Sequence, residues 1–214
     1  LFPCFWGKLF VHRDGLYMLA MSTEYGDLLI GRSDDGGHSF TAPVVLFRGS
    51  CTWAEKGLHK APMPVTLHAG RLWTAIDYGA WSTGGHASCL LSCDENADLT
   101  VAENWVLTRP TPYDPGWPGA VMGPSRGCLE GSAVVSPSGE IMNLLGYRTG
   151  SCEPDRNKAV VLKGIRSDPE QPLSLHKVID FPGNLSKFSV LRDEETGLYL
   201  SIVNRLSPPE VTEN

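Results

Sequence analysis

The sequence lacks the features that mark several large protein classes. No apolar run approaches the length of a membrane span, and 18 Lys and Arg stand against 24 Asp and Glu, which gives a formal net charge of -6. Because no basic patch is present, we expect neither a nucleic acid nor a membrane as a partner. The sequence also contains no phosphate-binding loop, HExxH motif or nucleophile elbow, so it favours none of the chemistries that depend on them.

Metal-binding motifs are also missing, although cysteine is not. The spacing of the six cysteines matches no zinc site and no CxxC pair. We therefore predict no metal and no organic cofactor, with the thiols packed in a core; disulfides remain the alternative if the protein is secreted. The cysteines are Cys4, Cys51, Cys89, Cys93, Cys128 and Cys152.

Helical periodicity is nearly absent, and 23 Gly and 16 Pro interrupt the chain throughout. What recurs instead is an apolar strand, a turn with glycine and a second apolar strand. Glycine suits such turns because positive φ costs it little. The four copies of this hairpin pattern cover residues 8–21, 63–76, 132–145 and 188–203.

Further apolar segments follow the first three hairpins. A third strand is predicted at 27–32, 87–92 and 158–165, and a fourth at 43–47, 105–107 and 176–181. Four antiparallel strands in each unit are typical of a propeller blade. We predict an all-β fold, a β-propeller of four-stranded antiparallel blades, of which this chain forms about three and a half. Residues 1–214 would then be one domain and a fragment truncated at both ends, because a propeller must close to remove its sheet edges.

One short motif follows the third strand of the first unit. Residues 33–40 read SDDGGHSF and fit the Asp-box pattern S-x-D-x-G-x-[ST]-[WF]. Asp35 can accept backbone hydrogen bonds across a turn, Gly37 supplies the unusual φ, and Phe40 anchors the turn in the blade. Ser33, Asp35 and Phe40 are therefore markers of the fold, away from any site.

With this motif and the blade-length repeat, the chain resembles the sialidase superfamily of Asp-box propellers, and in particular bacterial exo-sialidase-like glycoside hydrolases. The segment from Glu130 to Arg148 resembles a sialidase segment in which a glutamate opens an inner strand and an arginine follows the next strand. The resemblance implies a six-bladed ring when complete. It departs from the family in lacking the N-terminal Arg-Ile-Pro motif.

The same resemblance implies roles for particular residues. Glu130 would assist a tyrosine nucleophile lying beyond Asn214, Arg148 and Arg205 would bind the carboxylate of a sialic acid, and Asp77 is a candidate general acid. The implied activity is cleavage of a terminal acidic sugar from a glycan, with a sialoside or another acidic glycan as the partner.

Blade topology nominates a site without the family. In a propeller the first strand of each blade lines the axis and the second runs back antiparallel, so residues entering the first strand and leaving the second lie at one end of the channel. Convergent polar groups of this kind are candidates for a site. The entering residues are Lys8, His59, Lys60, Glu130 and Lys187, and the leaving residues are Glu24, Tyr25, Asp77, Tyr78, Tyr147, Arg148, Asn204 and Arg205.

From this set we single out Glu130 and Asp77 as catalytic candidates. The candidates for substrate binding are Arg148, Arg205, Lys187, Lys60, His59, Tyr78 and Tyr147. Two other functions remain open, because a fold does not fix a function. One is a noncatalytic propeller that binds a glycan or a protein, and the other is a polysaccharide lyase with Tyr or His as its base.

Overall fold

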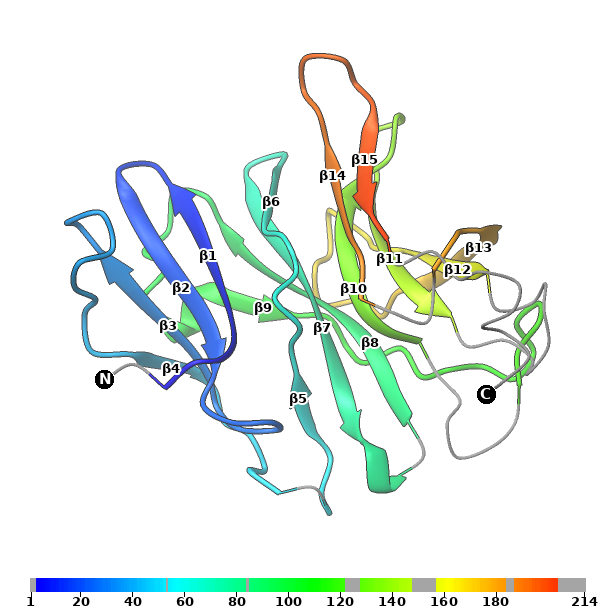
Figure 1. Ribbon diagram of the computed structural model, residues 1–214, viewed down its shortest axis with the longest axis horizontal. Coiled ribbons are helices and arrows are strands. Elements are labelled where there is room, and N and C mark those ends of the chain that lie inside the picture. Colours follow the sequence, from blue (N-terminus) through cyan, green and yellow to red (C-terminus); the bar gives the residue numbers. More distant parts are fainter. Residues whose placement is uncertain are drawn as a thin grey trace.

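The computed structural model of the protein describes residues 3–52, 54–83, 85–121, 128–147, 157–183 and 187–203. These residues form antiparallel sheets that follow one another in chain order (Figure 1). Two three-residue 3-10 helices, Trp81–Thr83 and Ala102–Asn104, are the helices of the described chain, and neither is long enough to cross a membrane.

The sheets are three blades and a hairpin. Blade 1 has the strand order β1-β2-β3-β4, blade 3 has the order β10-β11-β12-β13, and β14 pairs with β15. Their bounds are β1 Phe5–His12, β2 Gly15–Met21, β3 Leu28–Ser33, β4 Val44–Phe47, β10 Cys128–Val135, β11 Ile141–Tyr147, β12 Lys158–Lys163, β13 Ser174–Asp180, β14 Ser189–Arg192 and β15 Tyr199–Ile202.

Blade 2 differs from this pattern in its innermost strand. Its outer strands are β7 (Arg71–Ala80), β8 (Gly85–Asp94) and β9 (Trp105–Leu107), but the innermost position is shared by β5 (Gly57–His59) and β6 (Thr66–His68), both paired with β7. Pro62 and Pro64 lie in the interruption, and proline cannot donate to a ladder. The predicted all-β fold of four-stranded antiparallel blades is confirmed, with β5 as a strand that the sequence did not predict.

The hydrophobic core consists of three clusters, each between neighbouring sheets. The first joins Leu19 and Ile30 of blade 1 to Ile76 and Leu91 of blade 2. The second joins blade 2, through Trp73 and Leu90, to blade 3, and the third joins blade 3 to Phe188 and Val190 beside the last hairpin. Residues on both faces of β11 and β12 are therefore buried, which explains the near-continuous apolar character of these strands.

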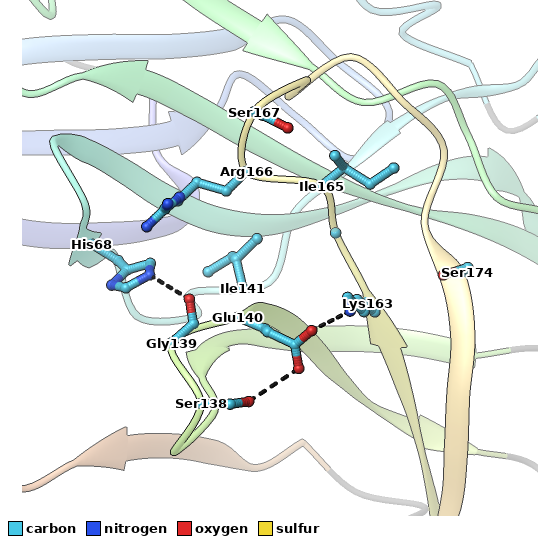
Figure 2. A pocket seen from close by; sticks show the side chains of 11 residues that line it. His68, Ser138, Gly139, Glu140, Ile141, Lys163, Ile165, Arg166, Ser167 and Ser174 are labelled. Carbon is cyan, nitrogen blue, oxygen red and sulfur yellow. Dashed lines mark hydrogen bonds and ion pairs between the residues drawn. The ribbon is translucent and has the colours of Figure 1, made fainter.

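The two ends of the blades carry different kinds of residue. We call the end where innermost strands begin and second strands finish the entry end; Phe5 and Met21 face each other there. The opposite end, where the hairpin turns such as that at Gly139 lie, is the turn end. A pocket of about 690 Å³ opens at the turn end between blades 2 and 3, lined by residues that include His68, Glu140 and Arg166 (Figure 2).

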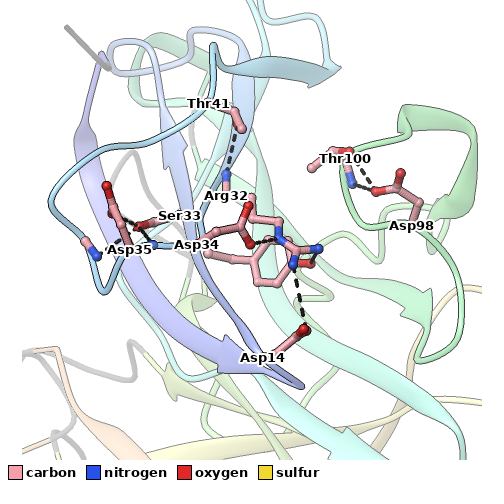
Figure 3. Close-up of polar contacts among 10 residues, drawn as sticks. Asp14, Arg32, Ser33, Asp34, Asp35, Thr41, Asp98 and Thr100 are labelled. Atoms are coloured by element: carbon pink, nitrogen blue, oxygen red, sulfur yellow. Dashed lines mark hydrogen bonds and ion pairs between the residues drawn. The ribbon is translucent and has the colours of Figure 1, made fainter.

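The Asp-box lies at the turn end of blade 1 and is a closed hydrogen-bonded turn (Figure 3). The carboxylate of Asp35 accepts hydrogen bonds from the Ser39 N–H (2.9 Å), the Ser39 hydroxyl (2.6 Å) and the Ser33 hydroxyl (2.7 Å). These donors, the Ser39 hydroxyl foremost, lower the pKa of Asp35. The motif joins β3 to β4, as the sequence predicted for a structural turn.

The five described cysteines, Cys4, Cys51, Cys89, Cys93 and Cys128, are free thiols. Burial raises the pKa of Cys89 to about 12 and that of Cys93 to about 11, so both are protonated at neutral pH. These two thiols pack in the core between blades 1 and 2, and they play no part in the site described below.

Candidate functional site

Two β-bulges at the entry end aim side chains away from the regular ladder. In blade 1 the register shifts between Phe5 and Lys8, and in blade 3 it shifts between Leu129 and Ser132. In each case two residues, an L-residue with positive φ and a glycine, oppose one residue on the partner strand. The L-residues are Trp6 (φ 55°) and Glu130 (φ 59°). Bulges at such places re-aim side chains, and positive φ in a bulky residue is a strained conformation that recurs at functional sites.

The glycine of each bulge is needed for close packing. A Cβ at Gly131 would lie 2.0 Å from Oδ1 of the buried Asn143, and a Cβ at Gly7 would lie 2.3 Å from Sγ of Cys4. Both distances are shorter than any that a Cβ atom adopts, so another residue at either position would force its neighbour to move. The sequences Trp6-Gly7 and Glu130-Gly131 therefore form the same local structure in two blades, and each presents one large side chain at the entry end.

Glu130 is held by groups from two other parts of the propeller. Its main-chain N–H donates a hydrogen bond of 2.9 Å to Oδ2 of Asp77 in blade 2. Its carboxylate Oε1 lies 3.1 Å from Nζ of Lys187, which precedes β14. Glu130 is thus held at its main chain by blade 2 and at its carboxylate by a cation from the start of the last hairpin.

His59 lies between two carboxylates of different blades. It pairs directly with Asp77 in the β5–β7 ladder, and its Nδ1 is 3.8 Å from Asp77 Oδ2. On its other side, Nε2 is 4.0 Å from Oε1 of Glu24, which follows β2. Glu24 and Asp77 are therefore one imidazole ring apart. Within the described residues, His59 Nδ1 and Asp77 Oδ1 are buried without a hydrogen-bond partner, and such orphaned groups call for an explanation.

Aromatic rings surround these charged groups. Nζ of Lys187 lies over the ring of Trp6, 3.8 Å from its centroid, which is a cation–π contact. The rings of Trp6 and His59 are 6.4 Å apart. Trp81, which follows β7 and is 46% exposed, donates from Nε1 to Oε1 of Glu24 over 3.3 Å. Exposed indole faces beside carboxylates are surfaces on which a sugar ring can stack.

The surroundings of Glu130 raise the pKa of its carboxyl group. Burial raises the pKa of Glu130, the adjacent Lys187 lowers it in part, and the charge of Asp77 raises it further. The net pKa of Glu130 lies above the ordinary value for a glutamate. A carboxyl group with a raised pKa is suited to donate a proton, as a general acid does.

A buried Tyr–His pair lies beneath the carboxylates. The hydroxyl of Tyr25 and Nε2 of His86 share a hydrogen bond of 3.0 Å, and the main-chain N–H of Trp81 donates to the same hydroxyl over 3.2 Å. Burial raises the pKa of Tyr25 to about 12 and lowers that of His86 to about 4. At neutral pH both groups are uncharged, so Tyr25 is poorly suited to the role of base that a lyase would require.

The structure brings Glu130, Asp77, His59 and Lys187 together, all four predicted from the sequence. It places three other candidates elsewhere. Lys60 is fully buried, donates from Nζ to the carbonyl of Ala61 over 2.9 Å, and has a pKa lowered by burial to about 7. The remaining two are described next.

Tyr147 and Tyr78 lie off this cluster. Tyr147 is completely buried and packs with Tyr113 and Trp117 in the core between blades 2 and 3. Tyr78 is 37% exposed and is adjacent to Asp77 in β7, so the two side chains project from opposite faces of the strand. Arg148 and Arg205 lie outside the described residues.

Sequence reasoning missed two members of the cluster, Trp6 and His86, and did not include Glu24 among its chosen candidates. Trp6 precedes a glycine just as Glu130 does, which is a signal for a bulge that the predicted start of the first strand overlooked. Among the described residues, no group of three His, Cys, Asp or Glu side chains is arranged to hold a metal ion.

We compared the chain with known proteins to identify the fold that it shares with them. No protein-family model matches the sequence, and no curated protein matches it. The sialidase resemblance of the Asp-box segment thus finds no support in these comparisons. Solved structures do match, among them glycosidases of family GH43.

A GH43 β-1,3-galactosidase solved with galactodeoxynojirimycin gives a TM-score of 0.57 at 11% identity, covering 97% of this chain and 70% of that one. An exo-β-1,3-galactanase from Clostridium thermocellum gives 0.56 at 10% identity, covering 91% and 41%. An α-L-arabinanase from Penicillium chrysogenum, solved with arabinobiose, gives 0.52 at 11% identity, covering 93% and 58%. This chain spans 53% of the length of a matching α-L-arabinofuranosidase from Lactobacillus brevis. At such identities the likeness establishes the fold alone, a partial propeller similar to those of glycoside hydrolases.

Proposed function

We propose that the protein is a glycoside hydrolase whose reaction takes place at the entry end, between Glu130, Asp77 and Glu24. The observation that carries the proposal is the half-buried carboxyl group of Glu130, whose pKa is raised and whose main-chain N–H is held by Asp77 of the neighbouring blade. Glycosidases cleave their substrates with a pair of carboxyl groups, one of which must be protonated while the other is ionised. The fold similarity to propeller glycosidases is consistent with this chemistry.

The roles within the site follow from burial and hydrogen bonding. Glu130 is the general acid, because it is the carboxyl group with a raised pKa and its side chain remains 14% exposed. The side chain of Asp77 is 2% exposed, and its carboxylate accepts the N–H of Glu130. Asp77 therefore positions Glu130, and its charge adds to the burial that raises the pKa of Glu130, instead of Asp77 acting as the general acid that the sequence suggested.

Glu24 is the partner carboxylate in this proposal. It is 16% exposed and lies across His59 from Asp77. We assign Glu24 the role of the base or nucleophile that acts with Glu130 on a glycosidic bond. Trp6 and Trp81 provide aromatic faces for the sugar rings beside these carboxylates.

We further propose an acidic sugar as the substrate, which retains the class suggested by the sequence. The supporting feature is Lys187, whose side chain is 44% exposed and whose ammonium lies at the carboxyl group of Glu130. Arg148 and Arg205, the two predicted carboxylate ligands, would add to this positive charge. The sialoside itself is one member of a wider class that includes uronic acids.

The test is a panel of fluorogenic glycosides that includes a sialoside, a glucuronide, an α-L-arabinofuranoside and a β-galactoside. We expect hydrolysis of an acidic glycoside, which Glu130→Gln lowers least for substrates with acidic leaving groups and which, for the carboxylated sugar, Arg148→Ala strongly reduces. Hydrolysis of neutral glycosides alone would overturn the acidic specificity and leave the hydrolase. A protein that binds sugars but hydrolyses none of the panel would instead be a noncatalytic glycan-binding propeller.

A further inference from the structure

The pocket at the turn end is built from three turns of two blades. Its walls come from the β6–β7 turn at His68, the β10–β11 turn at Ser138 to Glu140, and the loop that follows β12. All three lie at the end of the hairpins opposite Glu130 and Asp77, because each begins where an innermost or third strand finishes. The pocket is thus separate from the proposed catalytic site.

The walls of this pocket are fixed by hydrogen bonds. Nε2 of His68 donates to the carbonyl of Gly139 over 3.0 Å and so joins the turns of blades 2 and 3. The carboxylate of Glu140 accepts the Ser138 hydroxyl (3.1 Å) and pairs with Nζ of Lys163 (Figure 2). The acidic and basic side chains of this wall therefore satisfy each other.

One cation of the pocket is left over. Arg166 is exposed and extends from the loop after β12 toward the side on which His68 lies (Figure 2). Within the part of the chain that the structure describes, no hydrogen bond or ion pair joins its guanidinium to another group. An unpaired guanidinium in a preformed pocket is a donor for a planar or tetrahedral anion such as a carboxylate or a sulfate.

The other lining groups fit a sugar. Ser167 and Ser174 add hydroxyl groups, and Ile165, 45% exposed, adds an apolar surface for the C–H face of a pyranose ring. The volume of about 690 Å³ is within the range of ligand pockets and exceeds what a free inorganic anion fills. A nucleic acid would need several free cations, whereas this pocket has one and the chain carries a net charge of -6.

We propose that this pocket is a second, noncatalytic binding site for a chain of acidic polysaccharide, with Arg166 as the ligand for its carboxylate or sulfate groups. The site would hold the polymer to the protein while the entry end acts on another part of it or on another chain. The proposal concerns binding only, so it does not depend on the reaction at Glu130.

The test measures binding by isothermal titration calorimetry in a Glu130→Gln background, which prevents hydrolysis of the ligand. The probes are a carboxylated oligogalacturonate, a sulfated carrageenan oligosaccharide and a neutral arabino-oligosaccharide. Arg166→Gln is compared with Arg13→Gln, which removes the same charge from the turn end between blades 1 and 2, where Arg13 contacts Asn96. A Trp6→Ala variant reports any binding at the entry end.

We expect Arg166→Gln to weaken binding of at least one acidic probe by about tenfold or more, as the loss of a charge-assisted hydrogen bond requires. The neutral probe should be unaffected, and Arg13→Gln should bind as the background does. Which acidic probe responds identifies carboxylate or sulfate as the ligand. Equal affinities for Arg166→Gln and Arg13→Gln, no binding of either acidic probe, or binding that Trp6→Ala abolishes would each overturn the proposal. A normally active Glu130→Gln enzyme would refute the proposed function and not this site.

Discussion

The main-chain N–H of Glu130 in blade 3 donates its hydrogen bond to the carboxylate of Asp77 in blade 2, across the boundary between the two sheets. This contact is made at a bulge, where the N–H of Glu130 is released from the regular ladder. One bond therefore fixes the position of the proposed acid and places a negative charge beside it. Four predictions follow from this arrangement and from the turns that support it.

Replacing Glu130 by Gln should lower kcat on natural glycosides by roughly 10²- to 10⁴-fold, the usual contribution of a general acid. The loss should be much smaller for aryl glycosides with acidic leaving groups, because these need no proton to depart. The measurement is kcat across a series of leaving groups. The control is Glu194→Gln, which removes an exposed carboxylate in the β14–β15 turn that pairs with Arg192. An equal loss for all leaving groups would exclude the acid role.

Replacing Lys187 by Met should move the alkaline limb of kcat/KM to higher pH. Lys187 lowers the pKa of Glu130, so its removal lets burial and Asp77 raise that pKa further. A general acid acts in its protonated form, and activity falls as the pH rises through its pKa, which now lies higher. The control is Lys177→Met on the outermost strand of blade 3. An unchanged profile, or a shift to lower pH, would contradict the assignment of that limb to Glu130.

Replacing Gly131 by Ala should destabilise the protein by roughly 1–3 kcal/mol, the usual cost of overpacking, because the new Cβ would lie 2.0 Å from Oδ1 of Asn143. It should also lower kcat, since the bulge that aims Glu130 must shift. Urea unfolding and steady-state kinetics measure the two effects. Gly197→Asn serves as the control, because asparagine tolerates the positive φ of Gly197 and only the end of the flexible Arg192 side chain is near. A stable, fully active Gly131→Ala protein would show that the bulge can adjust at no cost.

Replacing Asp35 by Asn should lower the melting temperature at pH 7 without changing kcat or KM. The pKa of Asp35 is lowered by its three donors, so the carboxylate adds stability above the pKa of the unfolded chain and loses it as the pH falls toward the folded value. The melting temperatures of the two proteins should therefore begin to converge below about pH 4. The side chain is exposed, which keeps the effect small. A change in kcat on Asp35→Asn would contradict this prediction, because it would show that the Asp-box turn affects the reaction at the entry end.

Much of the fold could be predicted from the sequence because each blade repeats a local pattern. The hairpins around Gly70, Gly139 and Gly197 use glycine with positive φ at the turn, and the strands beside them are apolar on both faces. The break in the innermost strand of blade 2 could not be placed, since β5 is only three residues long and derives its pairing from β7. The register of β5 depends on its pairing with β7, and the β-strand propensities of three residues do not predict such a pairing.

The site was harder to predict than the fold. Topology correctly gathered Glu130, Asp77, His59 and Lys187 at one end, because strand direction fixes which termini meet. The sequence did not show which way each side chain points. Tyr147 ends the buried strand β11, in which no alternation of polar and apolar residues reveals the direction of a side chain. In β7 the polar residues Asp77 and Tyr78 are adjacent, so they project from opposite faces of the strand and only one of them, Asp77, belongs to the cluster.

The paired bulges at Trp6 and Glu130 have a consequence for how such a protein can change over generations. In both blades a glycine follows the bulge residue and opposes the same partner strand, while the residue before the glycine differs, tryptophan in one blade and glutamate in the other. A single codon per blade can then exchange an indole for a carboxylate, or either for another side chain, with the frame of the blade preserved. Equivalent positions in the repeated blades thus present different side chains at the entry end, and a single substitution at one of them changes the group that a ligand would meet.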